Sequence, residues 1–362
     1  MLALVEDAFV PLRAAVSALP AYVPGARAGA SDPAWKLSSN ENPYAPLPFV
    51  LDAITRAAAE VNRYPDMYAS ELVEALATHS GVSAENVVVG NGSVAVLAHI
   101  LNAVVEHGDE IVFPWRSFEA YPIAAAVSGG TIVTVPLEAG TARLDLPAMA
   151  AAVTPRTRVV LVCTPNNPTG PVVHADELET FLAAVPKDVL VVLDEAYLEF
   201  VRDPQSPDGI DVFTRHPNVV VLRTLSKAHG LAGLRVGYAI AEPRLAAGIR
   251  AVSTPFGVSH VAQAAALASL DPAAQSQLME RVETLVGERT RVVEALRDQG
   301  WDLPETHANF VWFDLGERTS ELAAEAKAAG VLVRPFAGDG IRVSIGDPEA
   351  NDAFLRVAAA WR

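Results

Sequence analysis

Cysteine is nearly absent from this sequence, and Cys163 is the only one in 362 residues. A single cysteine excludes an internal disulfide bond and a zinc site built from several thiolates. The 8 histidines are scattered, without an HExxH motif or a pair spaced one helical turn apart. We therefore expect a protein without a bound metal ion.

Long hydrophobic runs and an excess of positive charge are also lacking. No apolar run approaches the ~20 residues that a membrane-spanning helix needs. Near the N-terminus, Glu6 and Asp7 stand where an export signal carries Lys or Arg, so we expect a cytoplasmic protein. The 27 Lys and Arg against 43 Asp and Glu give a net charge of −16, which disfavours nucleic acids and anionic membranes as partners.

What the sequence does contain is a repeated order of short β-branched runs, turns and Ala- and Leu-rich stretches. The runs are Asn86–Val89, Glu110–Phe113, Thr131–Val135, Arg158–Cys163, Val189–Leu193, Val219–Leu222 and Arg235–Ile240. Most of them are apolar without alternation, as expected of strands that are covered on both faces. The intervening segments, such as Val94–Val105 and Ala175–Ala184, have helical composition. This order predicts an α/β fold with a mainly parallel, seven-stranded sheet.

The pattern changes in the last hundred residues. A long helix, about Pro272–Gln299, precedes the short strands Phe310–Asp314, Val331–Arg334 and Ile341–Ile345. We predict a large domain of residues 36–262 and a small α+β domain made of residues 1–35 and 263–362. The first 48 residues include an N-terminal arm, and their many prolines predict an extended path over the surface.

A glycine-rich loop follows the first predicted strand. Residues Gly90–Ala95 match the pattern G-x-G-x-x-A and open a helix, whose unpaired N–H groups suit a phosphate. Taken alone, this loop is equally consistent with a tight turn that binds nothing. The same pattern also occurs in dinucleotide-binding enzymes, so a NAD-dependent oxidoreductase is kept as a remote alternative. A dinucleotide site needs an acid after the next strand to hold a ribose, but Trp115 and Arg116 stand there. We therefore interpret the loop as a cradle for a single phosphate.

Lys227 lies in a loop of small residues that follows the predicted strand Val219–Leu222, with no acid within ten residues on either side. A lysine is more often an exposed surface group than a reactive one. Here the nearby cations Arg223 and Arg235 are expected to lower its pKa, as a nucleophilic amine requires. The sequence therefore makes Lys227 a candidate nucleophile.

Other polar side chains follow neighbouring strands of the predicted sheet. Asp194 and Tyr197 come after one strand, and Asn167 comes after the strand before it. The carboxyl ends of parallel strands are where α/β sheets bind ligands. Asp194 alone could cap a helix, and Asn167 alone could form a turn. Together with Lys227 they predict a pyridine cofactor, with an acid for the ring nitrogen, an amide and a phenol for the ring hydroxyl, and an amine for a covalent imine.

With these residues in view, the whole chain resembles the fold-type I pyridoxal-phosphate aminotransferases, in the group that holds histidinol-phosphate aminotransferases and their aromatic-amino-acid relatives. The resemblance rests on ordered motifs. They are Ser39–Pro43, Arg63–Pro65, Gly90–Ser93, Thr164–Gly170, Asp194–Tyr197, Thr224–Lys227, Gly233–Tyr238 and Ile341–Gly346. The fold implied is a large domain with a mainly parallel sheet beside a small α+β domain.

The resemblance implies pyridoxal 5'-phosphate as the cofactor and assigns catalytic roles to Lys227, Asp194 and Tyr197. Lys227 is implied to bind the cofactor covalently and carry the proton, and Asp194 to keep the pyridine nitrogen protonated. The other positions are Asn167 and Tyr197 at the ring oxygen, Trp115 on the ring face, Gly92, Ser93, Ser226 and Arg235 at the phosphate, and Tyr64 from the neighbouring subunit. A tyrosine reaching a neighbour's site implies a homodimer with shared active sites.

For the substrate, the resemblance implies that Arg342 grips the anionic end, with Asn167 beside it. Arg334 is a second candidate for this role, and Tyr22 is a candidate lid over the substrate. The sequence departs from the family at His229, where a Tyr or Phe is usual, and we assign His229 no catalytic role.

The activity implied is the ping-pong transfer of an amino group between an amino acid and a 2-keto acid such as 2-oxoglutarate. The segments Phe113–Pro122, Ala308–Trp312 and Arg334–Phe336 are most similar to the actinobacterial aromatic, or phenylalanine, branch. Residues Asn40–Pro43 are closer to histidinol-phosphate enzymes. We expect an aromatic donor, meaning phenylalanine, tyrosine or tryptophan, and keep histidinol phosphate as the alternative.

Overall fold

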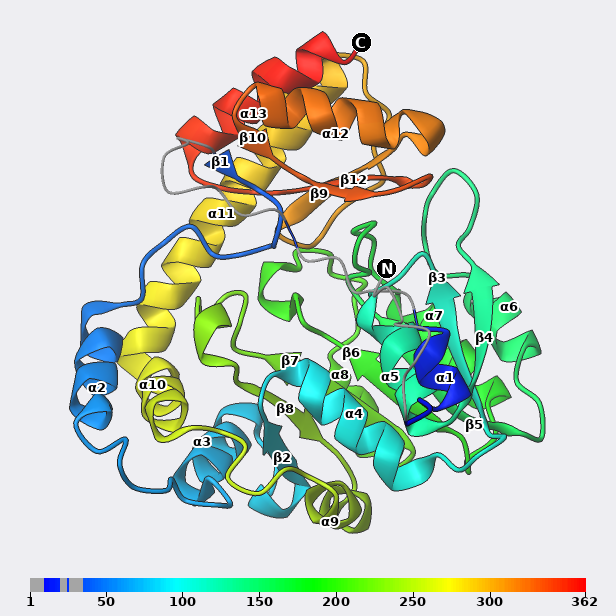
Figure 1. The fold of residues 1–362 in the computed structure, drawn as a ribbon, viewed down its shortest axis with the longest axis vertical. Helices are drawn as coiled ribbons and strands as arrows, with labels where there is room; N and C mark the ends of the chain where they lie inside the picture. The colour runs from blue at the N-terminus through cyan, green and yellow to red at the C-terminus, as the bar shows by residue number, and fades with distance from the viewer. Residues whose placement is uncertain (1–9, 20–24, 26–34) are drawn as a thin grey trace.

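A seven-stranded sheet forms the centre of the computed structural model, which describes residues 10–19, 25 and 35–362 (Figure 1). The strand order is β2-β8-β7-β6-β5-β3-β4, and only β8 runs antiparallel to its neighbours. The strands are β2 Val87–Gly90, β3 Glu110–Trp115, β4 Thr131–Pro136, β5 Thr157–Cys163, β6 Leu190–Asp194, β7 Val219–Thr224 and β8 Gly237–Ile240. The predicted α/β fold with a mainly parallel sheet is confirmed.

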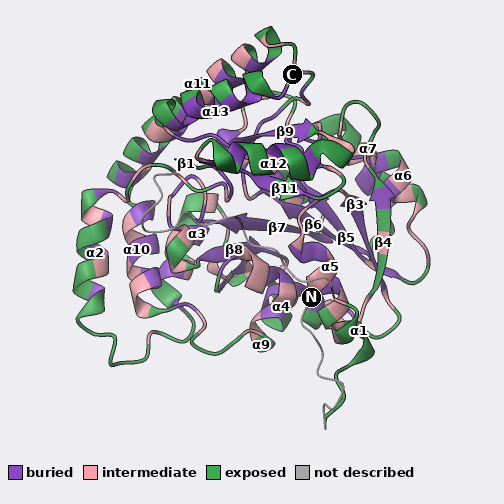
Figure 2. Cartoon of the chain, turned by 45° about the horizontal axis from the view of Figure 1, so that its top comes forward, coloured by how far each residue is buried: buried purple, intermediate pink, exposed green. Residues whose placement is uncertain are grey.

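Helices cover both faces of this sheet. The helices are α4 Ser93–Val104, α5 Ala120–Ser128 and α9 Pro243–Ala251 on one face, and α6 Leu146–Ala151, α7 Ala175–Ala184 and α8 Gly209–Arg215 on the other. Along β5, Val159 and Leu161 pack in the first layer while Val160 and Val162 pack in the second. Because both of their faces are buried, the inner strands β3, β5, β6, β7 and β8 are largely apolar, and Figure 2 shows them as buried, whereas the edge strand β4 is mostly exposed.

The face that holds α6, α7 and α8 is covered over β2, β7 and β8 by three more helices, which lead into a long helix. They are α2 Pro48–Ala58, α3 Ser70–Ser80 and α10 His260–Leu270. The helix α11, Pro272–Asp298, then runs from α10 to the second, smaller sheet (Figure 1). At about 1.5 Å per residue its 27 residues span roughly 40 Å, which carries the chain from one sheet to the other.

The second sheet has three antiparallel strands in the order β11-β12-β9. They are β9 Phe310–Asp314, β11 Arg334–Phe336 and β12 Gly340–Ser344, packed under α12 Thr319–Ala328 and α13 Pro348–Ala360. The prediction of one strand over Val331–Arg334 is wrong, because its two ends have different partners. Val331 and Leu332 form β10, parallel to β1 Trp35–Lys36, while Arg334 begins β11 and pairs with β12.

Two other local predictions also need correction. The proline-rich segment is not extended throughout, since it contains α1 Ala14–Ser17 and the start of α2, where Pro48 occupies the first helical turn, a position that tolerates proline. The strand predicted from Arg235 begins instead at Gly237. Arg235 has φ 57°, a left-handed conformation that a strand does not accommodate.

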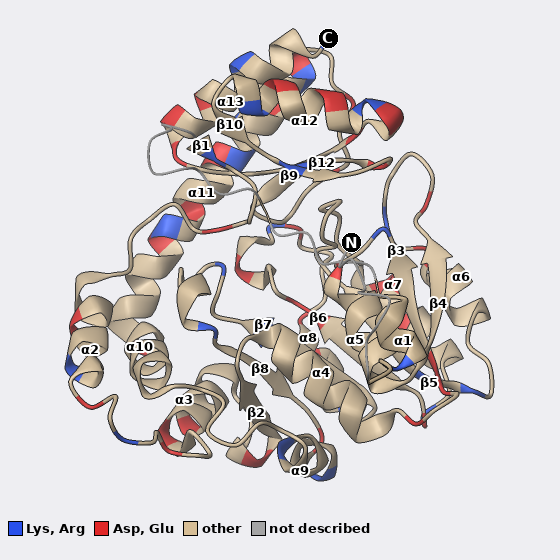
Figure 3. Cartoon of the chain, viewed as in Figure 1, with Lys and Arg blue, Asp and Glu red and all other residues tan. Residues whose placement is uncertain are grey.

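Charged side chains lie mostly on the outer helices and loops, and the central strands carry few of them (Figure 3). Within residues 10–19, 25 and 35–362, no helix is long and apolar enough to cross a membrane. Over the same residues, no three His, Cys, Asp or Glu side chains are grouped to hold a metal ion.

Candidate active site

A cavity of about 300 Å³ lies between the two sheets, at the carboxyl ends of the central strands. From the large sheet it is lined by Asp194 at the end of β6, by the loop after β5, by Thr224 at the end of β7, and by Ser226 and Lys227 just after it. Arg334, Phe336 and Arg342 reach it from the small sheet. The fold therefore brings together polar residues that are far apart in the sequence.

Lys227 projects into this cavity toward the segment that follows β1. Its Nζ lies 3.4 Å from the Ser39 carbonyl oxygen and 3.3 Å from that of Asn40. Desolvation, with a smaller effect from the nearby Arg342 guanidinium, lowers the pKa of Lys227 to about 7. A large fraction of this amine is therefore neutral near pH 7, as a nucleophile requires.

Asp194 is a buried carboxylate whose two oxygens differ. Oδ2 accepts a 2.7 Å hydrogen bond from the Tyr121 hydroxyl, whereas Oδ1 has no hydrogen-bond partner among the described residues. Burial raises the pKa of Asp194 to about 6, although the Tyr121 hydroxyl favours the charged form. An unsatisfied buried oxygen is costly, so Oδ1 is suited to accept a proton-bearing ligand atom.

The N-terminus of α4 forms a cradle for an anion. Gly92 has φ 83°, and a Cβ at this position would stand 2.5 Å from Nη2 of Arg235, so only glycine lets this arginine lie across the loop. Ser93 begins the helix, and Ser226 and Arg235 line the cavity beside it. A guanidinium, two hydroxyls and a helix N-terminus form a site suited to a phosphate.

Asn40 joins several parts of the cavity wall, although the sequence alone did not mark it as a site residue. Its Nδ2 donates a 2.9 Å hydrogen bond to the Tyr197 hydroxyl, and its Oδ1 accepts one of 3.0 Å from Ser344. The Tyr197 ring packs edge-on against Phe310 at a centroid distance of 5.1 Å. Tyr197 is therefore held in a fixed orientation, and burial raises its pKa, so that its hydroxyl stays protonated.

Asn167 and Arg342 meet within the cavity. Nη1 of Arg342 donates to Oδ1 of Asn167, and Nη2 donates to the Ser38 carbonyl oxygen at 3.1 Å. The guanidinium carbon lies 5.4 Å from the centre of the Phe310 ring. An arginine fixed in this way can present a planar pair of N–H groups to a carboxylate.

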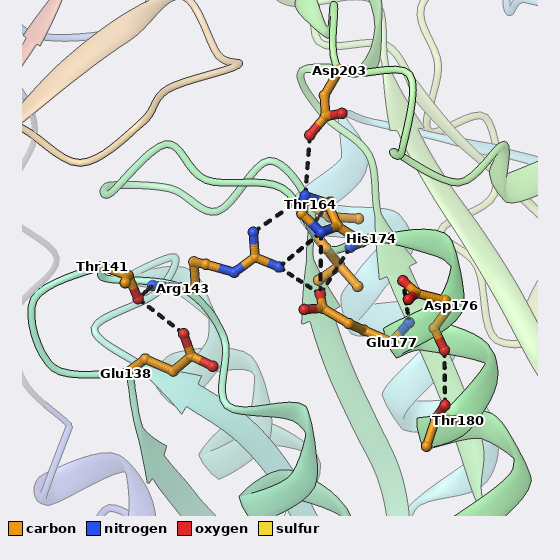
Figure 4. A network of polar contacts seen from close by, with 10 residues as sticks. Glu138, Thr141, Arg143, Thr164, His174, Asp176, Glu177, Thr180 and Asp203 are labelled. Carbon is orange, nitrogen blue, oxygen red and sulfur yellow. Dashed lines mark hydrogen bonds and ion pairs between the residues drawn. The ribbon is translucent and has the colours of Figure 1, made fainter.

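The loop that carries Asn167 is anchored at both ends. Near its start, Asn166 accepts from Ser117 at 2.7 Å and donates to Thr169 at 2.7 Å. At its far end, His174 contacts Arg143 at 3.3 Å and Asp203 at 3.1 Å in the polar network of Figure 4. These contacts link the loop to the β4–β5 connection and to the β6–β7 connection, which limits the positions that Asn167 can adopt.

Trp115 does not line the cavity, contrary to the role predicted for it. It ends β3, where its ring packs against Phe113 at 6.2 Å and lies 4.5 Å from the Arg116 guanidinium carbon. Phe118 lines the cavity instead, just before α5. The aromatic stretch was visible in the sequence, but which of its rings reaches the cavity was not.

Tyr64 and His229, two further residues named in the sequence analysis, do not line the cavity. Tyr64 is 84% exposed, and its ring packs against Phe256 at 4.7 Å. Tyr22 lies outside the described residues. His229 is buried, with its Nε2 atom 3.2 Å from Nε2 of Gln275, and burial lowers its pKa to about 4.

The arrangement fits the expected cofactor, pyridoxal phosphate. The cradle at α4 is of the right chemistry for its phosphate, and Oδ1 of Asp194 can accept a hydrogen bond from a protonated pyridine nitrogen. Asn167 and Tyr197 can contact the ring oxygen, and Lys227 lines the same cavity as a nucleophilic amine. Phe118 supplies an aromatic face.

The sequence and the structure are both similar to those of known proteins. The family model described as aminotransferase class I and II matches residues 33–358. The aromatic amino acid aminotransferases of Streptomyces avermitilis and Streptomyces coelicolor are 56% and 55% identical over 352 residues, covering 97% of this chain and 97% of each relative. The solved structure of histidinol-phosphate aminotransferase from Sinorhizobium meliloti, in complex with pyridoxal-5'-phosphate, is 31% identical, with a TM-score of 0.87 over 98% of this chain and 100% of that one.

Proposed function

The chain belongs to the class I and II aminotransferases, and we propose that it transfers the amino group of an aromatic amino acid to a 2-keto acid such as 2-oxoglutarate. The observation that carries this proposal is a cavity lined by Lys227, Asp194 and Arg342 in a chain more than half identical to enzymes named for aromatic amino acids. Phenylalanine, tyrosine and tryptophan are the donors that we expect.

Pyridoxal phosphate supplies an aldehyde that takes up the amino group and a ring that accepts electrons from the substrate's α-carbon. Lys227 would hold the cofactor through Nζ and would carry the proton at the substrate's α-carbon. Asp194 would keep a proton on the ring nitrogen through Oδ1. Arg235, Ser93 and Ser226 would hold the phosphate. The keto acid product leaves before the second keto acid enters, so the kinetics are of the ping-pong type.

The substrate is oriented by Arg342 and by the apolar part of the cavity. Arg342 binds the α-carboxylate, since it is fixed by Asn167 and the Ser38 carbonyl oxygen. Phe336 also lines the cavity and offers an aromatic surface to an aromatic side chain. This placement supports an amino acid with an aromatic ring.

Histidinol phosphate remains the alternative donor, because the structural relative from Sinorhizobium meliloti is named for that substrate. The remote NAD-dependent alternative receives no support from the family match. Steady-state assays with 2-oxoglutarate distinguish the two donors. We expect kcat/KM for phenylalanine to exceed that for histidinol phosphate by at least about tenfold. The reverse order contradicts the aromatic assignment.

The lowered pKa of Lys227 predicts how cofactor capture depends on pH. The neutral amine is the reactive form, so covalent capture of pyridoxal phosphate by the cofactor-free protein is expected to rise with pH and level off above about 7. Borohydride reduction at timed intervals followed by mass spectrometry measures this rate. A rate that still rises about tenfold per pH unit between pH 8 and 9 is the behaviour of an ordinary lysine and contradicts the prediction.

The exposed Tyr64 supports a homodimer with shared sites. A tyrosine that is 84% exposed in the protomer is available to a second copy, and we propose that its hydroxyl reaches the partner's cofactor phosphate. Tyr64→Phe keeps the contact with Phe256 and is expected to weaken cofactor binding about tenfold or more, the effect of losing a hydrogen bond to a charged group. Equilibrium dialysis measures the affinity, and sedimentation measures the assembly. A fully active monomer excludes this role.

We also propose how the chain divides into domains and where in the cell the protein acts. The chain is proposed to divide into a large domain of residues 36–262 and a small domain of residues 1–35 and 263–362, which α11 supports by running from one sheet to the other. The protein is proposed to act in the cytoplasm, for which the lack of any disulfide-forming pair is support, since Cys163 is the single cysteine.

A further inference from the structure

Tyr197 is a buried cavity residue whose hydroxyl receives a hydrogen bond from the protein. Its oxygen accepts a 2.9 Å hydrogen bond from Nδ2 of Asn40, and both residues line the cavity. A phenol has only one proton to donate. Because Asn40 gives a proton to this contact and takes none, the proton of Tyr197 is left for another acceptor. Under the proposed function, that acceptor is the ring oxygen of the cofactor.

The orientation of the Asn40 amide follows from its contacts with Ser344 at the end of β12. The backbone N–H of Asn40 donates to the Ser344 hydroxyl oxygen at 2.7 Å. The proton of that hydroxyl is then directed to Oδ1 of Asn40, at 3.0 Å. An amide that accepts through Oδ1 on this side presents Nδ2 on the other side, where Tyr197 lies. Ser344 therefore fixes which end of the amide faces the tyrosine.

The backbone at Asn40 limits which residues can replace it. Its φ of 53° is left-handed, a conformation that asparagine, aspartate and glycine adopt more readily than other residues. Asn40 is 1% exposed, and its carbonyl oxygen lies 3.3 Å from Nζ of Lys227. A change to aspartate or glycine can therefore alter the side chain while the backbone keeps its path beside the lysine.

We propose that Asn40 is a positioning residue that directs the proton of Tyr197 toward the ring oxygen of the cofactor. The hydrogen bonds run from Ser344 through Asn40 to Tyr197, and each contact fixes the direction of the next. An acceptor in place of the Asn40 amide nitrogen would turn the tyrosine's proton away from the cavity. The inference rests on the proposed function, since it takes Tyr197 as a partner of the ring oxygen.

The test follows the absorbance of the cofactor-loaded enzyme against pH, without any amino acid or keto acid. The ring oxygen shares a proton with the Lys227 nitrogen that holds the cofactor, and a hydrogen bond from Tyr197 favours the unprotonated oxygen. Tyr197→Phe removes this hydrogen bond and is expected to raise the midpoint of the absorbance change by about one pH unit.

Two substitutions at Asn40 separate orientation from packing. Asn40→Asp keeps the size and the acceptor for Ser344 but presents an acceptor to Tyr197, so we expect a shift about as large as that of Tyr197→Phe. Asn40→Gly keeps the backbone and removes the amide, which leaves the tyrosine's proton available to the ring oxygen, so we expect a smaller shift. A residue that only fills space gives the opposite order, because glycine removes more contacts than aspartate.

The controls are a double variant and a second buried asparagine. When Tyr197→Phe is already present, Asn40→Asp is expected to add little to the midpoint, whereas a direct effect of the new charge would persist. Asn218→Asp makes the same change just before β7, where Asn218 donates to the Val189 carbonyl oxygen at 2.9 Å. Asn218 does not line the cavity, so we expect no shift in this variant.

Three results overturn the proposal. The first is a shift in Asn40→Gly that equals or exceeds that in Asn40→Asp. The second is a shift from Asn40→Asp that persists without the tyrosine hydroxyl. The third is an unchanged midpoint in Tyr197→Phe, because the tyrosine's proton then does not reach the ring oxygen. No substrate is present, so a preference for histidinol phosphate over phenylalanine contradicts the proposed donor and leaves this result unaffected.

Discussion

Lys227→Ala is expected to lower turnover by at least about 10⁴-fold while leaving the protein folded. The substitution removes the amine that we propose binds the cofactor and moves the α-proton. The Lys227 amine makes long contacts with the carbonyl oxygens of Ser39 and Asn40, at 3.4 and 3.3 Å, and lies 5.8 Å from the centre of the Tyr197 ring, so its loss is expected to cost the fold little. Stopped-flow and steady-state assays with phenylalanine measure the effect.

The matched control is Lys327→Ala, which removes an exposed lysine in the last turn of α12 and should leave turnover unchanged. Borohydride reduction should fix the cofactor to wild type and to the control, but not to Lys227→Ala. Turnover within about tenfold of wild type in Lys227→Ala contradicts the role given to this residue.

Asp194→Asn is expected to lower kcat/KM by about 10²- to 10³-fold. The amide cannot hold a proton on the ring nitrogen, and breaking a buried charge pair costs about 3–5 kcal/mol, of which part is recovered by the isosteric amide. The change keeps the shape of a side chain that accepts a hydrogen bond from Tyr121. Single-turnover rates at saturating phenylalanine separate the effect on chemistry from any effect on substrate binding.

Tyr121→Phe provides the comparison for this second prediction. It removes the donor to Oδ2 but leaves the carboxylate charge and Oδ1 in place, so its effect is expected to be about tenfold or less. Equal losses in Asp194→Asn and Tyr121→Phe would indicate a packing defect rather than the loss of a charge partner.

The large sheet and the grouping of several candidate site residues at its edge were predictable from the sequence for a physical reason. Strands buried on both faces must be continuously apolar, and β5 shows this directly, with Val159 and Val160 packed in opposite layers. The parallel order also brings strand ends to one edge, which is why Asp194, Asn167 and Lys227 could be grouped before their distances were known.

The details that escaped prediction depend on contacts between distant segments. Nothing local shows that Phe118 rather than Trp115 reaches the cavity, because the choice depends on where β3 ends and α5 begins. The ion pair between Glu119 and Arg334 joins two segments separated by most of the chain. The division of the strand at Val333 likewise depends on β1 and β12 as partners.

The measurement that tests the central claim most directly is a half-reaction with phenylalanine alone. The cofactor-loaded enzyme is mixed with phenylalanine in the absence of any keto acid, and the cofactor absorbance is followed together with the release of phenylpyruvate. Amino transfer to the cofactor predicts rapid loss of the absorbance and about one phenylpyruvate per active site, and 2-oxoglutarate should restore the absorbance. No product before a keto acid is added, or rapid reaction only with histidinol phosphate, contradicts an aromatic aminotransferase that works through Lys227.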